Sequence, residues 1–396
     1  MDHQVIDADG DRDRQPVDAA MMGLALAHAA VARRRSAPNP WVGCVLAHGD
    51  TVVGAGATQA PGGAHAEIEA LADAGRQASG ATAYVTLEPC NHHGRTPPCT
   101  DVLVGAGVSR VVVAIADPDP HVAGAGIAAL RSHGITVDVG VCAAEAEREL
   151  LPYLVHRREG RAAAVLKLAT SLDGRTAAAD GSARWITGPE ARADVHRLRA
   201  ESQAVVIGAG TALADGPSLT ARDVEPPVEH QPLRVLLDAR GRVPARGPLF
   251  DQHLAPTLVL TTGAAPDDAT AAWLAAGAKV HTLPAGSGTA PRRPTGVDLR
   301  AALEHLGGLG VLQALVEPGP MLGAAFVSAG LADRVVVYTA PTFLGTRGRP
   351  ALDLAGPETI ADAEHWRLAS VARLGDDVRL DYDTVRLRGR TAGDQR

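Results

Sequence analysis

The chain has 396 residues, a formal net charge of -7 and only 3% aromatic residues. That length exceeds one ordinary hydrophobic core, so we expect two domains. The negative charge and the scarcity of aromatic side chains argue against a general nucleic-acid or membrane binder. No apolar run reaches the ~20 residues that a membrane helix needs.

The N-terminal segment 1–16 is acidic and polar, without the basic start and apolar stretch of a signal peptide. We therefore interpret it as a flexible tail and expect no export. The four cysteines are too few for a disulfide framework in a chain of this length, which fits a reducing cytoplasm. They are Cys44, Cys90, Cys99 and Cys142.

Helical and strand patterns alternate in the first part of the chain. Residues 18–35 predict a helix with Asp18 as its N-cap, and 41–57 predict a hairpin with a Gly-Asp turn. The remaining pattern predicts helices near 65–75, 100–107 and 125–134, and strands near 81–90, 108–118 and 135–141. Such alternation indicates a layered α/β domain, which we place at 17–150.

A second α/β series follows a charged helical segment at 143–160, which carries no strand pattern. We place a linker at 151–160, a second domain at 161–390 and a short tail at 391–396. Several expected strands of the second domain are continuous apolar runs, such as "AVVIGAG" from 204. Strands of a parallel sheet that are buried on both faces have this composition.

The segment "VTLEPCNHHGRTPPC", residues 85–99, indicates a metal site. Together with His65, which opens a predicted helix, Cys90 and Cys99 supply three zinc ligands. A catalytic zinc keeps its fourth position for water, whereas a structural zinc takes a fourth residue. His92 and His93 are candidates for that fourth ligand, so a structural site is the alternative.

Glu67 favours the catalytic alternative. It lies two residues after His65 and is not needed to complete the ligand set, so it is suited to carry a proton from water to a leaving amine. The pattern of H-x-E followed by two cysteines is the signature of zinc-dependent base deaminases.

A nucleotide site is indicated less strongly in the second domain. In "VEPGPMLGAAF", residues 316–326, an apolar strand ends at Glu317 and small residues lead into a helix. Backbone N–H groups at such a helix start can bind a pyrophosphate, although a plain strand-to-helix turn looks the same. The run "VVIGAGTAL" lacks the third glycine of a dinucleotide-binding fingerprint, because Leu213 stands there.

Several motifs resemble one known family in order along the chain. "APNPWVG", "HAE", "TLEPCNHHGRTPPC" and "ADPDPHVAGAGI" resemble the deaminase half of the bifunctional riboflavin-biosynthesis deaminase/reductases. "LKLATSLDGRTA", the stretch from Trp185 to Arg222, "LDARGRVP" and "VEPGPMLGAA" resemble the reductase half. The resemblance implies a cytidine-deaminase-like α/β/α layered domain followed by a dihydrofolate-reductase-like α/β domain.

For the deaminase half, the resemblance implies that His65, Cys90 and Cys99 bind one zinc ion and that Glu67 transfers protons. It also implies substrate contacts from Asn39, His92 and Arg95. Each of these three has an alternative: Asn39 can simply form a turn before proline, His92 can pack the loop, and Arg95 can be solvated.

For the reductase half, the resemblance implies two sets of contacts. Surface salt bridges remain an alternative for the arginines, and an ordinary edge position remains one for Lys167. The cofactor set is Ala169, Trp185, Thr211, Asp215, Gly319, Pro320, Met321, Leu322, Gly323, Ala324 and Ala325. The substrate set is Lys167, Ala183, Arg199, Leu219, Arg222 and Glu317.

Two positions depart from the family pattern. Ala183 stands where members often carry serine, with Ser182 one residue earlier, so a substrate hydrogen bond is lost or is made by Ser182. Ala239 replaces a serine in the "LDARGRVP" stretch, which removes one expected cofactor contact.

The implied activity is hydrolytic deamination of 2,5-diamino-6-(5-phosphoribosylamino)pyrimidin-4(3H)-one, then reduction of the ribosyl chain with NADPH. With this activity we expect small-molecule substrates and no nucleic-acid partner. We also expect a cytoplasmic homo-oligomer formed through the reductase domain. Two alternatives are a zinc deaminase acting on another nucleotide or on a nucleic-acid base, and a non-catalytic scaffold stapled by zinc.

Overall fold

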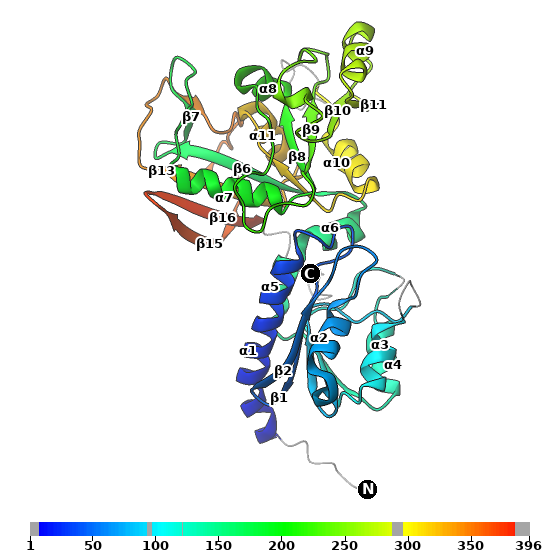
Figure 1. Ribbon diagram of the computed structural model, residues 1–396. Coiled ribbons are helices and arrows are strands. Elements are labelled where there is room, and N and C mark those ends of the chain that lie inside the picture. Colours follow the sequence, from blue (N-terminus) through cyan, green and yellow to red (C-terminus); the bar gives the residue numbers. More distant parts are fainter. Residues whose placement is uncertain (1–7, 93–96, 121, 287–295, 385–396) are drawn as a thin grey trace. The chain divides into compact units, whose positions relative to one another are not determined.

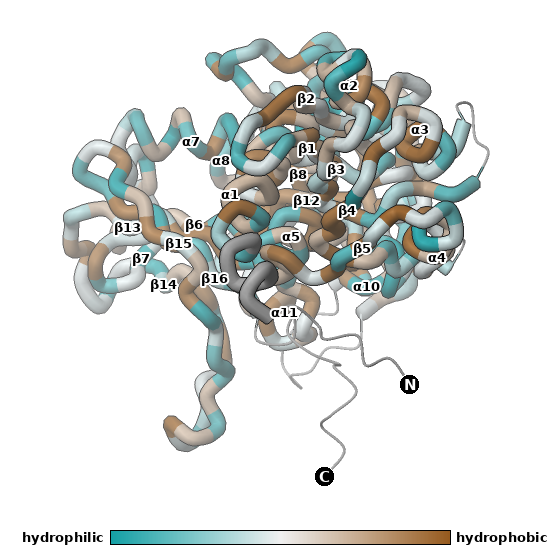
Figure 2. Tube along the Cα trace, turned by 90° about the horizontal axis from the view of Figure 1, so that it is seen from below, coloured by the Kyte–Doolittle hydropathy of each residue, from teal (hydrophilic) through white to brown (hydrophobic). Residues whose placement is uncertain are grey.

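The computed structural model describes residues 8–92, 97–120, 122–286 and 296–384. It divides into two compact units, Met1–Gly160 and Arg161–Arg396. Hydrophobic residues follow the strands of both sheets (Figure 2), and they form the buried cores. Among the described residues, no helix is both long and apolar enough to cross a membrane.

The first unit is built on a five-stranded sheet with the order β2-β1-β3-β4-β5. Its strands β1 and β2 lie side by side in Figure 1. Strand β1 pairs antiparallel with β2 and β3, whereas β3, β4 and β5 are parallel. The strands are β1 (Gly43–His48), β2 (Thr51–Ala57), β3 (Thr82–Val85), β4 (Arg110–Val113) and β5 (Thr136–Val139).

Two glycines place the first two helices on opposite faces of this sheet. A Cβ on Gly43 of β1 would lie 1.8 Å from the Ala25 carbonyl oxygen of α1 (Ala8–Ala32). A Cβ on Gly56, paired with Cys44, would lie 2.5 Å from the Ala66 carbonyl oxygen of α2 (Ala66–Ala74). Neighbouring strand residues point to opposite faces, so the predicted α/β/α layering is confirmed.

The other helices of this unit complete its layers. They are α3 (Cys99–Gly105), α4 (Ala125–Ser132), α5 (Ala143–Glu149), α6 (Leu151–Glu159) and the short 3₁₀ helix η1 (Gly75–Ala78). Helix α6 occupies the segment that we expected to be a linker. Five of its residues are buried, so it packs as part of the first unit: Leu151, Pro152, Tyr153, Leu154 and Val155.

The first helix starts earlier than predicted. It begins at Ala8, within the expected tail, and Asp18 lies in its interior rather than at its N-cap. The buried Asp18 carboxylate accepts hydrogen bonds from the Arg110 guanidinium, at 2.8 and 2.7 Å, and from the Tyr84 hydroxyl at 2.8 Å. A tertiary ion pair therefore uses the residue that local propensity favours as a cap. The C-terminal tail 391–396 lies outside the described residues.

The second unit contains a nine-stranded sheet with the order β11-β10-β9-β8-β12-β6-β13-β16-β15. Its pairs are parallel from β11 to β13, and β16 and β15 continue the sheet antiparallel. The strands are β6 (Ala163–Ser171), β8 (Ala204–Gly208), β9 (Leu233–Leu237), β10 (Thr257–Thr261), β11 (Lys279–Thr282), β12 (Gln313–Val316), β13 (Arg334–Ala340), β15 (Trp366–Leu374) and β16 (Asp377–Thr384).

Helices cover both faces of this sheet. On one face, Leu303 of α10 and Phe326 of α11 pack against Leu166 and Val206. On the other face lie α7, α8 and α9, which contribute residues such as Val195 and Trp273 to two further buried clusters. The helices are α7 (Pro189–Ala200), α8 (Ala209–Asp215), α9 (Asp267–Ala275), α10 (Leu299–Gly308) and α11 (Pro320–Ser328). The smaller elements are β7 (Arg175–Ala177), β14 (Arg349–Pro350), η2 (Pro248–Phe250) and η3 (Ile360–Asp362).

A buried ion pair joins the starts of two neighbouring strands in the second unit. The Arg161 guanidinium donates two hydrogen bonds to the Asp333 carboxylate, at 2.7 and 2.8 Å, and the Ala164 N–H donates a third at 2.8 Å. Their side chains are 3% and 7% exposed. Asp333 precedes β13, and Arg161 precedes its parallel neighbour β6, so the pair fixes where the two strands enter the sheet.

We predict that Asp333→Ala lowers the free energy of unfolding of the second unit by about 3–5 kcal/mol, because it removes the carboxylate that balances the charge of the buried Arg161 guanidinium. Urea unfolding followed by circular dichroism measures the loss. Asp376→Ala is the matched control, since the Arg373–Asp376 pair is 81% and 88% exposed and should contribute little. Equal stability of the two variants would contradict the anchoring role of the buried pair.

Candidate active sites

Three potential metal ligands converge in the first unit. His65 Nδ1 lies 3.6 Å from Cys90 Sγ and 3.3 Å from Cys99 Sγ. All three ligand atoms lie within 4.8 Å of one another, and Cys99 is buried while the other two are half-buried. One imidazole nitrogen and two sulfur atoms form a donor set that suits zinc.

Each ligand comes from the end of a regular element. His65 is the N-cap of α2 and has an extended backbone, so its side chain leaves the helix start. Cys90 follows the end of β3, after Pro89, and Cys99 is the first residue of α3. The Cys99 N–H donates to Cys90 Sγ at 3.4 Å, and the Thr100 N–H donates to the Cys90 carbonyl oxygen at 3.3 Å. The start of α3 thus holds both cysteines together.

Glu67 lies in the first turn of α2, next to the cluster. It is 3% exposed, and burial followed by the charge of Cys90 raises the pKa of its carboxyl group. A raised pKa makes the Glu67 carboxylate a stronger base, which suits a group that accepts a proton and then donates it.

The two cysteines titrate in opposite directions without a metal ion. The hydrogen bond that Cys90 accepts from Cys99 lowers the pKa of the Cys90 thiol, and the same bond raises the pKa of the Cys99 thiol. One thiolate is therefore already favoured, and thiolate is the form in which cysteine binds metals.

The predicted substrate residues of the first unit are placed less completely. Asn39 is half-buried in the turn before Trp41, where its N–H donates to the Ser36 carbonyl oxygen at 2.8 Å. His92 is exposed. Arg95 and His93 lie outside the described residues.

Four charged residues gather in the second unit. Both oxygens of the Glu317 carboxylate, just after β12, accept hydrogen bonds from the Arg199 guanidinium of α7, at 2.6 and 2.9 Å. Burial alone would raise the pKa of Glu317, but the charge of Arg199 and its hydrogen bonds lower it to about 2. Burial lowers the pKa of the Lys167 ammonium. The nearby charges of Glu317, Arg199 and Asp215 also shift this pKa, by smaller amounts.

The ion pair with Arg199 occupies both oxygens of the Glu317 carboxylate. Because both of its oxygens are engaged, the carboxylate mainly orients Arg199, which also donates to the Thr220 carbonyl oxygen at 3.1 Å. Arg222 donates from its Nη1 to the Ser218 and Thr220 hydroxyls, at 2.8 and 2.7 Å. Two guanidinium groups and two hydroxyls thus meet near Thr220, a combination suited to a phosphate.

The sequence analysis missed His196 in this group. Its Nδ1 lies 3.1 Å from the Thr220 carbonyl oxygen, and burial, Arg199 and Arg222 lower its pKa. Its position three residues before Arg199 on a predicted helix is the signal that could have found it, because such residues share a helix face.

Two further predicted substrate residues lie near this region of the chain. Leu219 is buried and has a positive φ of 55°, in the same loop as Ser218 and Thr220. Ala183 is half-buried. The Ser182 hydroxyl donates to the Asp180 carboxylate at 2.7 Å, so in this structure it is already engaged.

The predicted nucleotide residues bring two helix starts together. Helices α8 and α11 follow the neighbouring parallel strands β8 and β12, and a Cβ on Gly319 would lie 3.2 Å from the Thr211 hydroxyl oxygen. Gly323 and Ala324 are buried on the inner side of α11, whereas Met321 is 60% exposed. The free N–H groups at this helix start suit a pyrophosphate.

The other predicted cofactor residues lie on separate elements. Ala169 is in β6 and is half-buried, and Asp215 ends α8. Trp185 is 71% exposed, with the Arg192 guanidinium 4.7 Å from its ring centroid. An exposed aromatic face next to a cation is available for a flat ligand.

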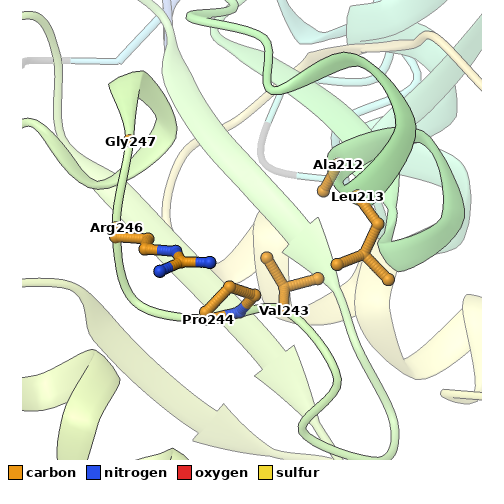
Figure 3. A pocket seen from close by; sticks show the side chains of 6 residues that line it. All are labelled: Ala212, Leu213, Val243, Pro244, Arg246 and Gly247. Carbon is orange, nitrogen blue, oxygen red and sulfur yellow. The ribbon is translucent and has the colours of Figure 1, made fainter.

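A cavity of about 400 Å³ lies between α8 and the loop after β9. Figure 3 shows Ala212 and Leu213 on one side, and Val243, Pro244 and Arg246 on the other, with Gly247 nearby. None of these residues was predicted from the sequence as a site residue.

Comparisons with known proteins identify the family of each unit. Residues 16–115 match the family model "Cytidine and deoxycytidylate deaminase zinc-binding region", and 163–380 match "RibD C-terminal domain". The riboflavin biosynthesis protein RibD of Chlamydia trachomatis is 42% identical over 88% of this chain and 90% of its own length. The protein of that name from Escherichia coli K12 is 40% identical over 92% and 98%.

Solved structures extend the agreement to the fold. Acinetobacter baumannii RibD, 37% identical, superposes with a TM-score of 0.80 over 93% of this chain and 99% of its own. A Thermotoga maritima diaminohydroxyphosphoribosylaminopyrimidine deaminase/5-amino-6-(5-phosphoribosylamino)uracil reductase, 28% identical, gives 0.78 over 94% and 99%. The protein therefore belongs to the RibD family of bifunctional riboflavin-biosynthesis enzymes, which combine a zinc-binding deaminase domain with an NADPH-dependent reductase domain.

Proposed function

We propose that the first unit hydrolytically deaminates 2,5-diamino-6-(5-phosphoribosylamino)pyrimidin-4(3H)-one and that the second unit reduces the ribosyl chain of the product to ribityl. The observation that carries the first step is the buried Glu67 carboxyl group beside the cluster of His65, Cys90 and Cys99. The name of the Thermotoga maritima relative supports this choice of substrate.

In the deaminase site, we assign His65 Nδ1, Cys90 Sγ and Cys99 Sγ as zinc ligands. Zinc, when bound, lowers the pKa of a water molecule and so supplies a nucleophile at neutral pH. Glu67 accepts a proton as water adds to the amino-bearing ring carbon and gives that proton to the ring nitrogen. It then takes the second proton from the new hydroxyl group and gives it to the amino group, which leaves as ammonia while the carbonyl group forms. Asn39, His92 and Arg95 are proposed to bind the substrate.

We predict that Glu67→Gln lowers the deamination rate by roughly 10²–10⁴-fold, because it removes the proton carrier and keeps the side-chain shape. Ammonia release from the diaminopyrimidine phosphate measures the rate, and metal analysis should show zinc retained. Reduction of pre-formed deaminated substrate should be unchanged.

Glu69→Gln is the matched control on the same helix. Glu69 is half-buried and accepts a hydrogen bond from the Gln59 side chain at 3.0 Å, so the substitution neutralises a neighbouring carboxylate away from the cluster. A Glu67→Gln protein that lost its zinc would show that Glu67 supports the metal rather than the proton transfers.

The zinc assignment leads to a second prediction. Cys90→Ser and Cys99→Ser should each lose bound zinc and deamination, because a hydroxyl group is a poor replacement for a thiolate on zinc. Cys142→Ser, at the start of α5, is the control and should keep both. All four cysteines are free in the structure, so a mild reductant should leave activity intact. Inactivation by reductant with zinc still bound would contradict the assignment.

In the reductase site, we assign Arg199 and Arg222 to the substrate phosphate, with Leu219 and Ala183 beside the sugar. Glu317 orients Arg199 and lies near Lys167, which is placed to contact the reacting chain. NADPH supplies the hydride. Its proposed contacts are Ala169, Trp185, Thr211, Asp215 and the α11 start from Gly319 to Ala325.

We predict that a fragment from Arg161 to the C-terminus folds and reduces the deaminated substrate with a preference for NADPH. This range carries its own sheet and all of the proposed reductase residues. Charge-assisted hydrogen bonds to the extra phosphate contribute ~1.5–3 kcal/mol each, which corresponds to a preference of about tenfold or more. Rates with NADPH and NADH at equal concentration test it. A folded fragment that binds neither nucleotide would contradict the assignment.

We also infer a cytoplasmic homo-oligomer formed through the reductase domain. The support is the family membership, together with Leu368 and Val371 of the edge strand β15, which are 50% and 59% exposed. Light scattering on the purified chain measures its mass in solution.

A further inference from the structure

Glu88 is a buried carboxylate two residues before Cys90, and it is not one of the three clustered ligand residues. It is 4% exposed and is surrounded by backbone N–H groups. Its Oε1 accepts from Gly126 at 2.9 Å and from Ile127 at 3.1 Å, and its Oε2 accepts from Gly124 at 3.0 Å and from Asp117 at 3.2 Å.

The first turn of α4 depends on this carboxylate. The N-cap of α4 is Gly124, whose φ is 83° and which has no side chain to accept a hydrogen bond. The first N–H groups of a helix need an acceptor, and the positive end of its dipole favours an anion. Glu88 supplies both from a segment that is 36 residues away along the chain.

The same contacts hold the segment from Glu88 to Cys90 in place. The Glu88 N–H donates to the Ile115 carbonyl oxygen at 3.0 Å. A Cβ on Gly126 would lie 2.0 Å from the Pro89 carbonyl oxygen, so α4 packs directly against the peptide that leads into Cys90. Proline also restricts φ at position 89. The backbone that carries the Cys90 sulfur is therefore fixed by its side chain, its N–H group and its packing.

We propose that Glu88 is a positioning residue for Cys90: by binding the start of α4, it fixes the Cys90 thiolate in the geometry that zinc requires. The proposal rests on the ligand role assigned to Cys90 under the proposed function. A ligand that is already ordered loses no further freedom on binding the metal, and groups that orient ligands typically contribute 10–100-fold to metal affinity. Glu88 itself does not contact the substrate or the metal in this account.

The experiment compares the full-length Glu88→Gln and Tyr153→Phe proteins with the unmodified protein. Glutamine keeps the shape of the side chain, but its NH₂ group faces two backbone N–H donors. The hydrogen bonds to one of the two side-chain oxygens are therefore lost. Tyr153 donates from its hydroxyl to Asp117 at 3.1 and 3.0 Å. Its substitution therefore loosens the start of the same 117–127 segment without touching Glu88 to Cys90.

Two measurements report on the metal site rather than on turnover. Competition with a chromophoric chelator gives the zinc dissociation constant, and the visible spectrum of the cobalt-substituted protein reports ligand geometry. We expect Glu88→Gln to weaken zinc binding by about 10–100-fold and to change the cobalt spectrum. Tyr153→Phe should leave both unchanged. Glu88→Asp keeps the charge but is one methylene shorter, and it should give an intermediate zinc affinity.

Wild-type zinc affinity and cobalt spectrum in Glu88→Gln or Glu88→Asp, even with a lowered melting temperature, would overturn the proposal, because Glu88 would then only cap α4. Equal losses of zinc affinity in Glu88→Gln and Tyr153→Phe would overturn it as well. General loosening around Asp117 and α4 would then explain the weaker zinc binding without a specific role for Glu88. Failure of the underlying assignment is distinguished by Cys90→Ser: if that variant keeps its zinc, Cys90 is not a ligand.

Discussion

The geometry of this protein depends on one constraint, which is that parallel strands buried on both faces are largely apolar, so that many of the polar site residues lie at or beyond their ends. In the first unit, β3 is buried from Ala83 to Val85, and Glu88 and Cys90 follow its carboxyl end. In the second unit, β8 and β12 are buried, parallel neighbours in the sheet. Thr211 and Glu317 follow their carboxyl ends. Ligand sites of open α/β sheets lie at this edge for the same reason.

Electrostatics then distinguishes the two sites. In the first unit, a buried carboxyl group, whose pKa is raised by burial, lies beside two cysteine sulfur atoms that share a proton. Such a site is suited to moving protons. The charged group of the second unit balances the Glu317 carboxylate against Arg199 and Lys167, and this holds Glu317 ionised and Arg199 in one orientation. Such a group is suited to binding an anion.

Carboxylates that accept hydrogen bonds from backbone N–H groups of distant segments occur in both units. Glu88 binds the start of α4, and Asp173 accepts from the Leu344 and Gly345 N–H groups at 3.1 and 2.7 Å. Each joins segments that are distant in sequence. A charged acceptor holds such loops more firmly than a neutral one, because its hydrogen bonds are stronger.

The sequence by itself determined the alternation of helices and strands, the ligand types and spacing of His65, Cys90 and Cys99, and the position of Glu67 beside them. These follow from local periodicity and from the chemistry of a few residue types, which need no knowledge of distant contacts. The turn from strand to helix at Glu317 was also predictable from local periodicity.

Only the tertiary structure decided which polar groups meet. Asp18 looked like a helix cap and is an ion-pair partner of Arg110. Glu317, which the resemblance assigns to the substrate, also pairs with Arg199, a contact that the sequence did not predict. Glu88 looked like part of a motif and caps a helix that begins 37 residues later. These pairings join residues from different elements, and their energies depend on burial and distance, neither of which local sequence patterns contain.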